Sequence, residues 1–574
     1  MAATTGSGSH AVTRAQWAPV EGAAQLFTPE FVDYVVRLQD ELTPRVRALL
    51  ARRQEVLARA LEQGILPAHP PRSAINTGDW KVPPVPADLR KPGIEISGPC
   101  SITSMFINAL NPGPEGERAA GDLDDDEDSA GHRLVDTVRA AHHRVAAVHR
   151  ELRHVDAEKG KEYTIADGEL PFFMHRERGI HLDEPDFTVD GRPIPAAILG
   201  TALTLYYVGR AQAERGQGIY FYLPKLESAE ECAWYRDLFD RSRALLPHLR
   251  DAVISAIPLV ESLPAVYQME EMLYALGPYA GGLNAARWDL KASIFEFVMA
   301  DPRSVWPDRF GVDIKTTPFL ANIFRRLVAI CLKRGAAPVG GMATALPSAD
   351  PQVNRVAGEA IRKDKEWEAR QGFLRAWVAH IFHMKTAGDP FKELIASGWT
   401  PTAEMADPDR YPVTIEVPDG PITLEGTRRN ARMVVEYLEG WLTGRGAKGI
   451  DSLAGKPGVH PALMEDLATG RMSVAQIAQR IRHRATTTDG AQLHDVPLVK
   501  RLLQEETEDI LVRLGATVKD DRGRAAYADA EQRYRKAVKI AMRWIKNYTE
   551  LDFRSLGSYT RAELDRIASA PDAF

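Results

Sequence analysis

Short apolar runs alternate with longer amphipathic segments through the middle of the chain. The runs have the length and apolar content of β-strands, and most are separated by segments with the 3.6-residue period of a helix. The strand candidates are 93–98, 119–124, 172–177, 219–223, 252–260, 281–289, 337–343 and 375–380. About eight such β/α units over roughly 300 residues predict an α/β fold, a (β/α)8 TIM barrel. An open doubly wound sheet is the competing fold.

The pattern changes at both ends of the chain. Residues 29–63 have helical periodicity, and residues 66–86 are rich in proline, as in a linker or an ordered strap. From about residue 389 the strand signal fades and the remaining apolar positions recur at helical spacing. We therefore expect a disordered lead, N-terminal helices and a strap in 1–86, the barrel in 87–388, and an all-helical C-terminal domain in 389–574.

Composition narrows the class of protein. The 574-residue chain is 44% apolar and 26% charged with a net charge of −6, which gives no reason to expect binding to nucleic acid or to an anionic membrane. The three cysteines, Cys100, Cys232 and Cys331, lack the spacing of a disulfide framework. Since we find no apolar run of about 18 residues and no signal sequence, we expect a cytoplasmic protein.

Two carboxylates are the first candidates for chemistry. Glu261 and Asp289 each follow an apolar, strand-like run, so in a barrel both would lie at the C-terminal rim, where active sites occur. Carboxylates placed there suit a hard cation such as Mg²⁺, which would polarise a carbonyl substrate. The alternative is that each carboxylate caps the helix that follows it.

Other charged residues are weaker candidates. The acidic run 122–128 is either a solvated loop or the source of Glu127 and Asp128, acids beside the metal that would orient its bound water. Arg178, directly before a glycine, could hold a carboxylate or a developing enolate oxygen, or could form a surface salt bridge. Lys225 is a weaker basic candidate of the same type.

Three patterns carry little functional signal. Asp466, in a predicted helix, has no local feature that distinguishes it from a solvated aspartate. The segment 444–449 matches GxGxxG, but it follows a helix, which favours a glycine-rich helix C-terminus over a dinucleotide loop. Four histidines on one polar helix are better explained as a solvated face than as a metal site: His142, His143, His149 and His154.

Several segments nevertheless occur in a recognisable order. They are Ile94-Glu-Ile-Ser-Gly-Pro99, Arg178-Gly-Ile-His-Leu182, Tyr222-Leu-Pro-Lys225, Glu261-Ser-Leu-Pro-Ala265, Arg287-Trp-Asp289, Gly340-Gly-Met-Ala343, Trp377-Val-Ala-His380 and Met464-Glu-Asp466. Each segment alone is weak. Together they cover most of the chain and resemble the malate synthase family in its shorter A form.

The resemblance implies a Mg²⁺-dependent Claisen condensation of acetyl-CoA, or another acyl-CoA, with glyoxylate, giving malate and CoA. It implies that Glu261 and Asp289 bind the metal and that Glu127 and Asp128 are acids beside it. The implied partners are a small 2-oxo acid and an acyl-CoA. The oligomeric state is left open.

The same resemblance implies roles for four further residues. Arg178 corresponds to the arginine that stabilises the enolate, and Asp466 to the general base that removes a proton from the acetyl methyl group. Trp377 corresponds to an aromatic wall of the pocket, and Met464 would lie near the CoA site. A base on the helical domain means that domain closure would complete the site.

The chain departs from the family pattern near the expected substrates. The family's Gly-His-Asp-Gly-Thr-Trp-Val-Ala-His-Pro-Gly-Leu is Gly372-Phe-Leu-Arg-Ala-Trp-Val-Ala-His-Ile-Phe-His383 here, so a His-Asp pair is lost and Ile381 and Phe382 replace Pro-Gly. Ala286 replaces a glycine where the backbone would meet the oxo acid. These changes leave two alternatives open, a different 2-oxo acid or acyl-CoA, and a non-catalytic CoA-binding protein.

Overall fold

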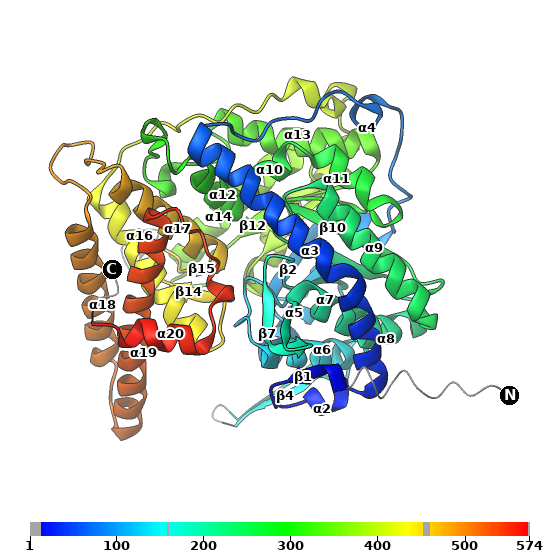
Figure 1. The fold of residues 1–574 in the computed structure, drawn as a ribbon, viewed down its shortest axis with the longest axis horizontal. Helices are drawn as coiled ribbons and strands as arrows, with labels where there is room; N and C mark the ends of the chain where they lie inside the picture. Colours follow the sequence, from blue (N-terminus) through cyan, green and yellow to red (C-terminus); the bar gives the residue numbers. More distant parts are fainter. Residues whose placement is uncertain (1–12, 158–159, 452–459, 572–574) are drawn as a thin grey trace.

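Eight parallel strands close into a barrel at the centre of the structure, a computed structural model that describes residues 13–157, 160–451 and 460–571 (Figure 1). The strands are β2 (Gly93–Pro99), β3 (Gly121–Asp125), β6 (Phe172–Arg176), β9 (Ile219–Leu223), β10 (Ile254–Val260), β11 (Gly282–Ala285), β12 (Ala337–Ala343) and β13 (Arg375–Val378). Each pairs with the next in chain order, and β13 closes the ring against β2. The predicted (β/α)8 barrel is confirmed.

The strands are buried because helices cover the outside of the barrel and side chains fill its interior. Every residue of β9 and β10 is buried. The main helices between and after the strands are α5 (Thr103–Leu110), α6 (Leu134–Val148), α7 (Ala196–Leu203), α8 (Gly209–Glu214), α9 (Ala229–Leu245), α11 (Met269–Leu276), α12 (Arg287–Val298), α13 (Pro318–Arg334), α14 (Pro351–Gln371) and α15 (Met384–Ala396). This alternation places the carboxyl ends of all eight strands at one rim.

One predicted strand boundary is wrong, and it concerns a candidate residue. The run 281–289 was expected to be one strand, but β11 ends at Ala285 and α12 begins at Arg287, so Asp289 lies in the first turn of a helix. A carboxylate is stabilised there by the helix dipole. Neither candidate carboxylate is a helix cap, because Ala286 precedes α12 and Ser262 caps the short helix after Glu261.

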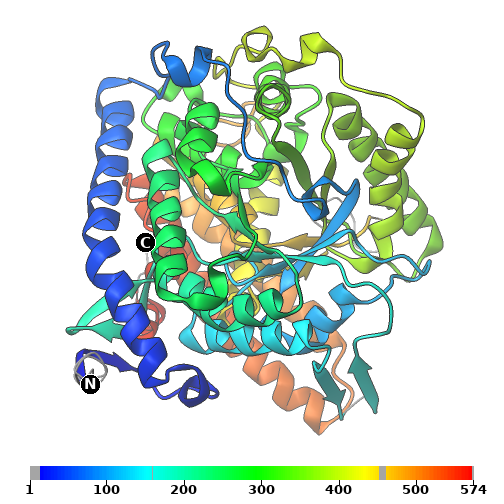
Figure 2. The same ribbon diagram turned by 90° about the vertical axis from the view of Figure 1, so that its right-hand side faces the viewer.

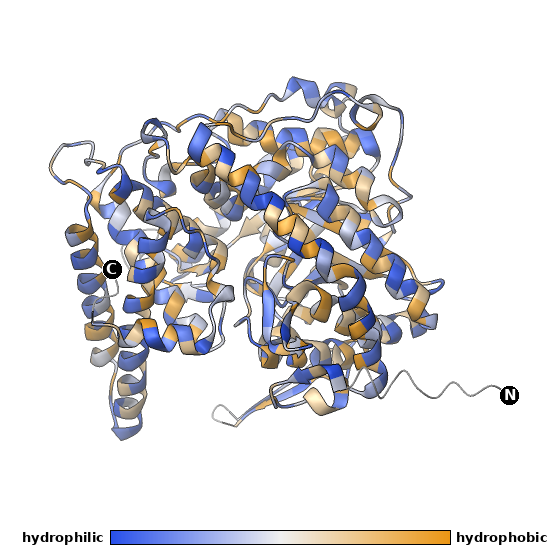
Figure 3. Ribbon diagram, in the orientation of Figure 1, coloured by the Kyte–Doolittle hydropathy of each residue, from blue (hydrophilic) through white to orange (hydrophobic). Residues whose placement is uncertain are grey.

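The N-terminal helical segment is a single helix, α3 (Pro29–Gln63), which lies along α9 on the outside of the barrel (Figure 2). Its buried positions include Phe31, Val35, Leu38 and Leu42, a spacing that faces one side of a helix toward the core. The alternation of hydrophobic and hydrophilic residues along α3 is visible in Figure 3. Among the described residues, no helix is long and apolar enough to cross a membrane.

The proline-rich stretch is an ordered strap, not a free linker. It contains the short helix α4 (Ala74–Thr77) and is held against the barrel by Arg334 at the end of α13. The guanidinium of Arg334 donates to the carbonyl oxygens of Ile75, Gly78 and Trp80 at 2.9, 2.7 and 3.1 Å. The predicted disordered lead, residues 1–10, lies outside the described residues.

The C-terminal part is helical, as predicted, and sits beside the barrel rim (Figure 1). It comprises α16 (Leu424–Leu442), α17 (Leu467–Arg482), α18 (Val496–Ala516), α19 (Asp521–Thr549) and α20 (Arg561–Ser569). The sequence did not predict its two short strands, β14 (Lys448–Ile450) and β15 (Leu463–Glu465). Residue 389 falls inside α15, which packs on β2 and β13, so we propose that the helical domain begins after α15.

Candidate active site

A cavity lies at the C-terminal rim of the barrel, between the barrel and the helical domain. Its barrel side includes Ser97, Asp125, Asp128, Arg176, Glu261, Ala286, Asp289, Met342 and Trp377, and its helical-domain side includes Met464, Asp466 and Thr469. The backbone N–H of Met464 donates to the carbonyl oxygen of Thr344 at 2.8 Å, just beyond β12. In the described structure, the helical domain therefore forms one wall of the site.

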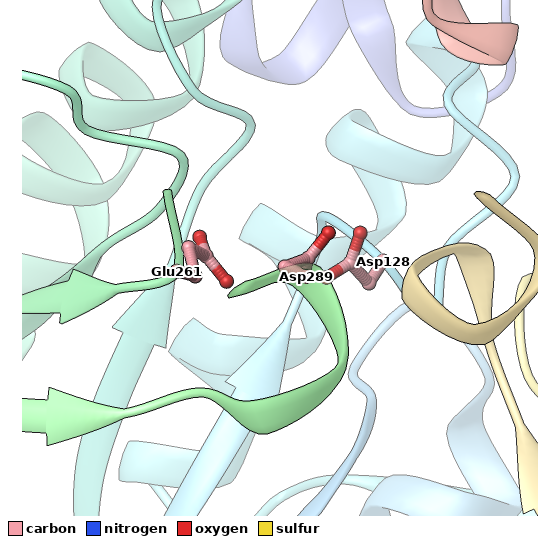
Figure 4. A group of neighbouring side chains, drawn as sticks. All are labelled: Asp128, Glu261 and Asp289. Atoms are coloured by element: carbon pink, nitrogen blue, oxygen red, sulfur yellow. The ribbon is translucent and has the colours of Figure 1, made fainter. Parts of the chain in front are cut away.

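Three buried carboxylates converge at the floor of this cavity (Figure 4). Glu261 follows β10, Asp289 lies in the first turn of α12, and Asp128 follows β3. One oxygen from each lies within 4.8 Å of the others, a spacing at which all three can hold one cation. The resemblance placed Asp128 beside the metal, whereas the position of its carboxylate suits a direct ligand as well as those of Glu261 and Asp289 do.

The turn after β3 is built around Asp125. Its carboxylate accepts hydrogen bonds from the backbone N–H groups of Glu127 and Ser129, both at 2.9 Å. It also accepts from the Ser129 hydroxyl at 2.6 Å. These bonds satisfy the donors of a buried turn, and they turn the side chain of Asp128 toward the cavity. The acidic run is therefore buried, and the solvated-loop alternative is wrong.

Lys225 supplies positive charge to the carboxylates. Its ammonium nitrogen lies 2.7 Å from Asp128 Oδ2 and 2.8 Å from Asp289 Oδ2. It is also 3.3 Å from Glu127 Oε2 and 3.6 Å from Glu261 Oε2, while its backbone N–H donates to Glu261 Oε1. Lys225 has φ of 54°, which a non-glycine residue rarely adopts and which is typical of strained functional sites.

The pKa values of Glu261 and Asp289 are shifted in opposite directions. Burial raises the pKa of Glu261 to about 8 against the charge of Lys225, and the neighbouring carboxylates of Asp289 and Asp128 add to the rise. Burial also opposes ionisation of Asp289, but Lys225 and Arg471 outweigh it and hold the pKa of Asp289 below its usual value.

The unused oxygen atoms of the cluster test whether a metal fits. Glu261 Oε2, Asp128 Oδ1 and Glu127 Oε1 are buried and have no hydrogen-bond partner among the described residues. Buried polar atoms are normally satisfied, so these atoms are available as ligands. A set of carboxylate oxygens of this kind suits Mg²⁺.

Asp466 enters the cavity from the helical domain. It is the N-cap of α17, and its Oδ1 accepts from the backbone N–H of Ala468 at 3.1 Å. A reciprocal bond joins its own N–H to the Thr469 hydroxyl at 3.2 Å, which fixes the residue at the cavity wall. Burial, with the charges of Asp128 and Asp289 nearby, holds the pKa of Asp466 well above the usual value of an aspartate. The alternative of an ordinary solvated aspartate does not hold, because Asp466 is partly buried at the cavity wall.

Two arginines lie at the end of β6, Arg176 and Arg178, and their surroundings differ. Arg176, the last residue of β6, lines the cavity and lies 3.6 Å from Asp128 Oδ2. Arg178 does not line it. Its guanidinium instead donates to Thr137 at 3.0 Å and to Glu184 at 2.6 Å. Arg178, the candidate singled out from the sequence, is therefore not part of the cavity lining, whereas Arg176, which sequence reasoning missed, is.

Trp377 and Met464, to which the resemblance gave places near the substrates, both line the cavity. The indole N–H of Trp377 lies 3.2 Å from Glu95 Oε2 and 3.1 Å from the Tyr222 hydroxyl. Arg375 pairs with the same Glu95 inside the barrel, so this wall is held in place by a buried polar network.

The altered family positions are not all at the site. Ala286 lines the cavity, whereas Ile381 and Phe382, in a short helix after β13, do not. The loss of Pro-Gly at these two positions therefore does not change the cavity wall directly.

The GxGxxG match and two of the four histidines have structural roles. The segment 444–449 leaves the end of α16 and enters β14, with Gly444 at φ of 87°, as in a helix C-terminus. His142 bonds the carbonyl oxygen of Gly22 at 2.9 Å, and His143 bonds that of Cys100 at 2.7 Å. Within the described residues, the group of Asp128, Glu261 and Asp289 is the one set of side chains with metal-binding spacing.

Comparisons with known proteins agree along most of the chain. Residues 19–71 match the family model "Malate synthase, N-terminal domain", residues 172–415 match "Malate synthase, TIM barrel domain", and residues 421–561 match "Malate synthase, C-terminal". These three matches follow the order of helix, barrel and helical domain in the structure.

Individual relatives match at similar levels. The chain is 34% identical over 502 residues to malate synthase A of Escherichia coli (strain K12), covering 86% of this chain and 90% of that protein. It is 34% identical over 548 residues to malate synthase of Streptomyces clavuligerus, covering 94% and 96%. Among solved structures, the chain is similar to a citrate lyase beta subunit from M. tuberculosis, complexed with oxaloacetate and magnesium. The match covers 53% of this chain and 99% of that chain, with 14% identity and a TM-score of 0.31. A similarity this low supports no conclusion about function.

Proposed function

The chain belongs to the malate synthase family, and from this we propose that it condenses acetyl-CoA with glyoxylate to give malate and CoA, with Mg²⁺ as the metal. One observation carries the proposal. Asp466 from the helical domain lines the same cavity as Arg176 and the carboxylates Asp128, Glu261 and Asp289 of the barrel. A base, a cation-binding group and a positive charge are what this carbon–carbon bond formation requires.

Asp466 is the proposed base. The methyl protons of a thioester are weakly acidic, so removing one requires a carboxylate of raised basicity and a positive partner for the enolate oxygen. The raised pKa of Asp466 supports the first role. We assign the second to Arg176 in place of Arg178, because Arg176 is the one of the two that faces the cavity.

Asp128, Glu261 and Asp289 would hold the Mg²⁺ ion. When bound, the ion supplies polarisation of the oxo-acid carbonyl group. The enolate carbon then bonds to the aldehyde carbon of glyoxylate, and the new alkoxide takes up a proton. Water adds to the thioester carbonyl and the CoA thiol leaves, so malate and CoA are released. The closed helical domain would limit the access of bulk water while the enolate exists.

A second candidate keeps this chemistry but changes the substrate. Ala286, which stands where the family has glycine, lines the cavity and narrows it by a methyl group. A panel of 2-oxo acids and acyl-CoAs, run with wild type and Ala286→Gly, distinguishes the two. A clear preference of the wild type for acetyl-CoA and glyoxylate would exclude the changed substrate.

The direct test is release of thiol from acetyl-CoA with glyoxylate and Mg²⁺, with omission of glyoxylate as the control. We expect glyoxylate-dependent release. No release with any oxo acid at high enzyme concentration would leave the third alternative, a CoA-binding protein without turnover. Failure to bind Mg²⁺ at millimolar concentration would support that alternative further. We keep a cytoplasmic location as a proposal that rests on the unpaired cysteines.

A further inference from the structure

Arg471 links the helix that carries Asp466 to the barrel. It lies in α17, little more than one turn after Asp466, and its side chain reaches α12, with which α17 packs (Figure 1). Arg471 Nε lies 2.8 Å from Glu296 Oε1, and a second nitrogen pairs with Glu296 Oε2. Its third nitrogen lies 3.3 Å from Asp289 Oδ1.

This contact is buried and shared. The side chains of Asp289 and Glu296 are 3% and 8% exposed, and that of Arg471 is 23% exposed. Glu296 also accepts a hydrogen bond from the Tyr548 hydroxyl of α19 at 2.8 Å. The Glu296 carboxylate therefore joins Arg471 of α17 and Tyr548 of α19 to α12, the barrel helix that also carries Asp289.

The two carboxylate oxygens of Asp289 face two different cationic side chains. Its Oδ2 faces Lys225 at 2.8 Å, and its Oδ1 faces Arg471. Arg471 thus orients Asp289 and also removes part of the negative charge that the carboxylate would offer to a metal. Because Arg471 does not line the cavity, it acts through Asp289 and through the placement of α17, and not on a substrate.

We propose that Arg471 is a positioning residue that fixes Asp466 over the cation site and holds the affinity of that site for a divalent ion below its maximum. The inference rests on the proposed function, since it takes Asp466 as the base. Under this proposal, Arg471 affects metal affinity and turnover in opposite directions, which a purely structural cross-link would not do. Loss of Arg471 tightens metal binding while it lowers turnover.

The test compares Arg471→Met with wild type by Mn²⁺ binding, followed by electron paramagnetic resonance without substrates, and by steady-state kinetics. We expect Mn²⁺ affinity to rise about three- to tenfold, because a positive charge near the carboxylates is removed. We expect kcat to fall about 10²-fold through displacement of the base. The KM values should change little.

Two further variants complete the design. Arg471→Lys keeps the charge but loses the fork, so its Mn²⁺ affinity should match wild type while kcat still falls. Arg482→Met, an exposed position at the end of the same helix, should change neither quantity. If Arg471→Met does not fold, the double variant Arg471→Gln with Glu296→Gln removes both partners of the ion pair together, so no charge is left without its partner. It should still bind Mn²⁺ more tightly than wild type, but by less than Arg471→Met, because a negative charge is removed as well.

The outcomes separate this inference from the proposed function. Unchanged or weaker Mn²⁺ binding in a folded Arg471→Met, beside an active wild type, would overturn the role of Arg471 alone. Wild-type turnover retained by Arg471→Met would do the same. A wild type that neither binds Mn²⁺ nor releases thiol would overturn the proposed function, and the inference with it.

Discussion

Arg176 and Asp125 form a bidentate ion pair at the rim of the barrel. Two guanidinium nitrogens of Arg176 lie 2.7 and 2.6 Å from the two carboxylate oxygens of Asp125. Asp125 also holds the turn that brings Asp128 into the cavity, through the backbone N–H groups of Glu127 and Ser129. The proposed enolate-stabilising charge and one proposed metal ligand are therefore fixed by the same carboxylate.

The first prediction concerns the choice between the two arginines. Arg176→Lys keeps a positive charge but cannot span both oxygens of Asp125, so the charge moves away from the enolate position. We expect kcat to fall about 10²- to 10³-fold, the range for loss of one stabilising donor. Arg178→Lys is the matched control, and it should keep turnover close to wild type because Arg178 faces Glu184. The opposite ranking in the thiol-release assay would restore Arg178 to the role that the sequence suggested.

The second prediction concerns stabilisation by metal. Ligand binding stabilises the folded state, by about 2.7 kcal/mol when the free ligand is at 100 times its Kd. Mg²⁺ should therefore raise the Tm of the wild type, whereas Asp289→Asn and Glu261→Gln should lose most of the rise. Thermal melts at matched ionic strength, with NaCl in place of MgCl₂, provide the control. An equal rise in all three proteins would place the metal elsewhere.

The third prediction concerns acid and the contact between domains. His132, in the loop after β3, accepts a hydrogen bond from the Trp441 indole N–H of α16 at 3.1 Å. Burial lowers the pKa of His132 to about 4, and the charge of Arg178 adds to the fall. The folded state therefore favours the neutral ring over the protonated one. Its stabilising effect is complete above an unfolded pKa of about 6.5 and is lost as the pH falls toward 4.

The magnitude and the check follow from that shift. The loss is about 3 kcal/mol between pH 6.5 and pH 4, at 1.36 kcal/mol for each pKa unit. His132→Asn keeps an acceptor for Trp441 and tolerates the left-handed backbone at φ of 53°, but it cannot be protonated. Denaturant unfolding at several pH values should therefore show a shallower acid dependence in the variant. Identical pH profiles would rule out His132 as the titrating group.

The barrel could be predicted from the sequence because strands such as β9 and β10 are apolar over most of their length. β9 and β10, each fully buried, appear as runs such as Ile219–Leu223 that no amphipathic helix would contain. Glu261 and Asp289 could be found because each follows such a run. Asp289 was placed on the wrong element, since an apolar run does not show where a strand ends and a helix begins.

The remaining site residues depend on contacts between distant parts of the chain. Asp466 has an ordinary helix N-cap sequence, and only its placement against the barrel makes it a partly buried neighbour of Asp128 and Asp289. Arg471 gains its partners in the same way. One feature of the sequence could have drawn attention to Arg176. Alternate residues of a strand share a face, so Arg176 points to the same side of β6 as Met174. Arg178 lies beyond the strand, where this alternation no longer holds.

The proposed mechanism depends most on Asp466 as the base that makes the carbon nucleophile. The decisive measurement is thiol release and Mn²⁺ binding by Asp466→Asn beside wild type, in one preparation series. Asparagine still caps α17 but cannot take up the proton, so we predict that kcat falls by about 10²- to 10⁴-fold while Mn²⁺ affinity is retained. Turnover close to wild type, or loss of Mn²⁺ binding together with turnover, would contradict the assignment of Asp466 as the base.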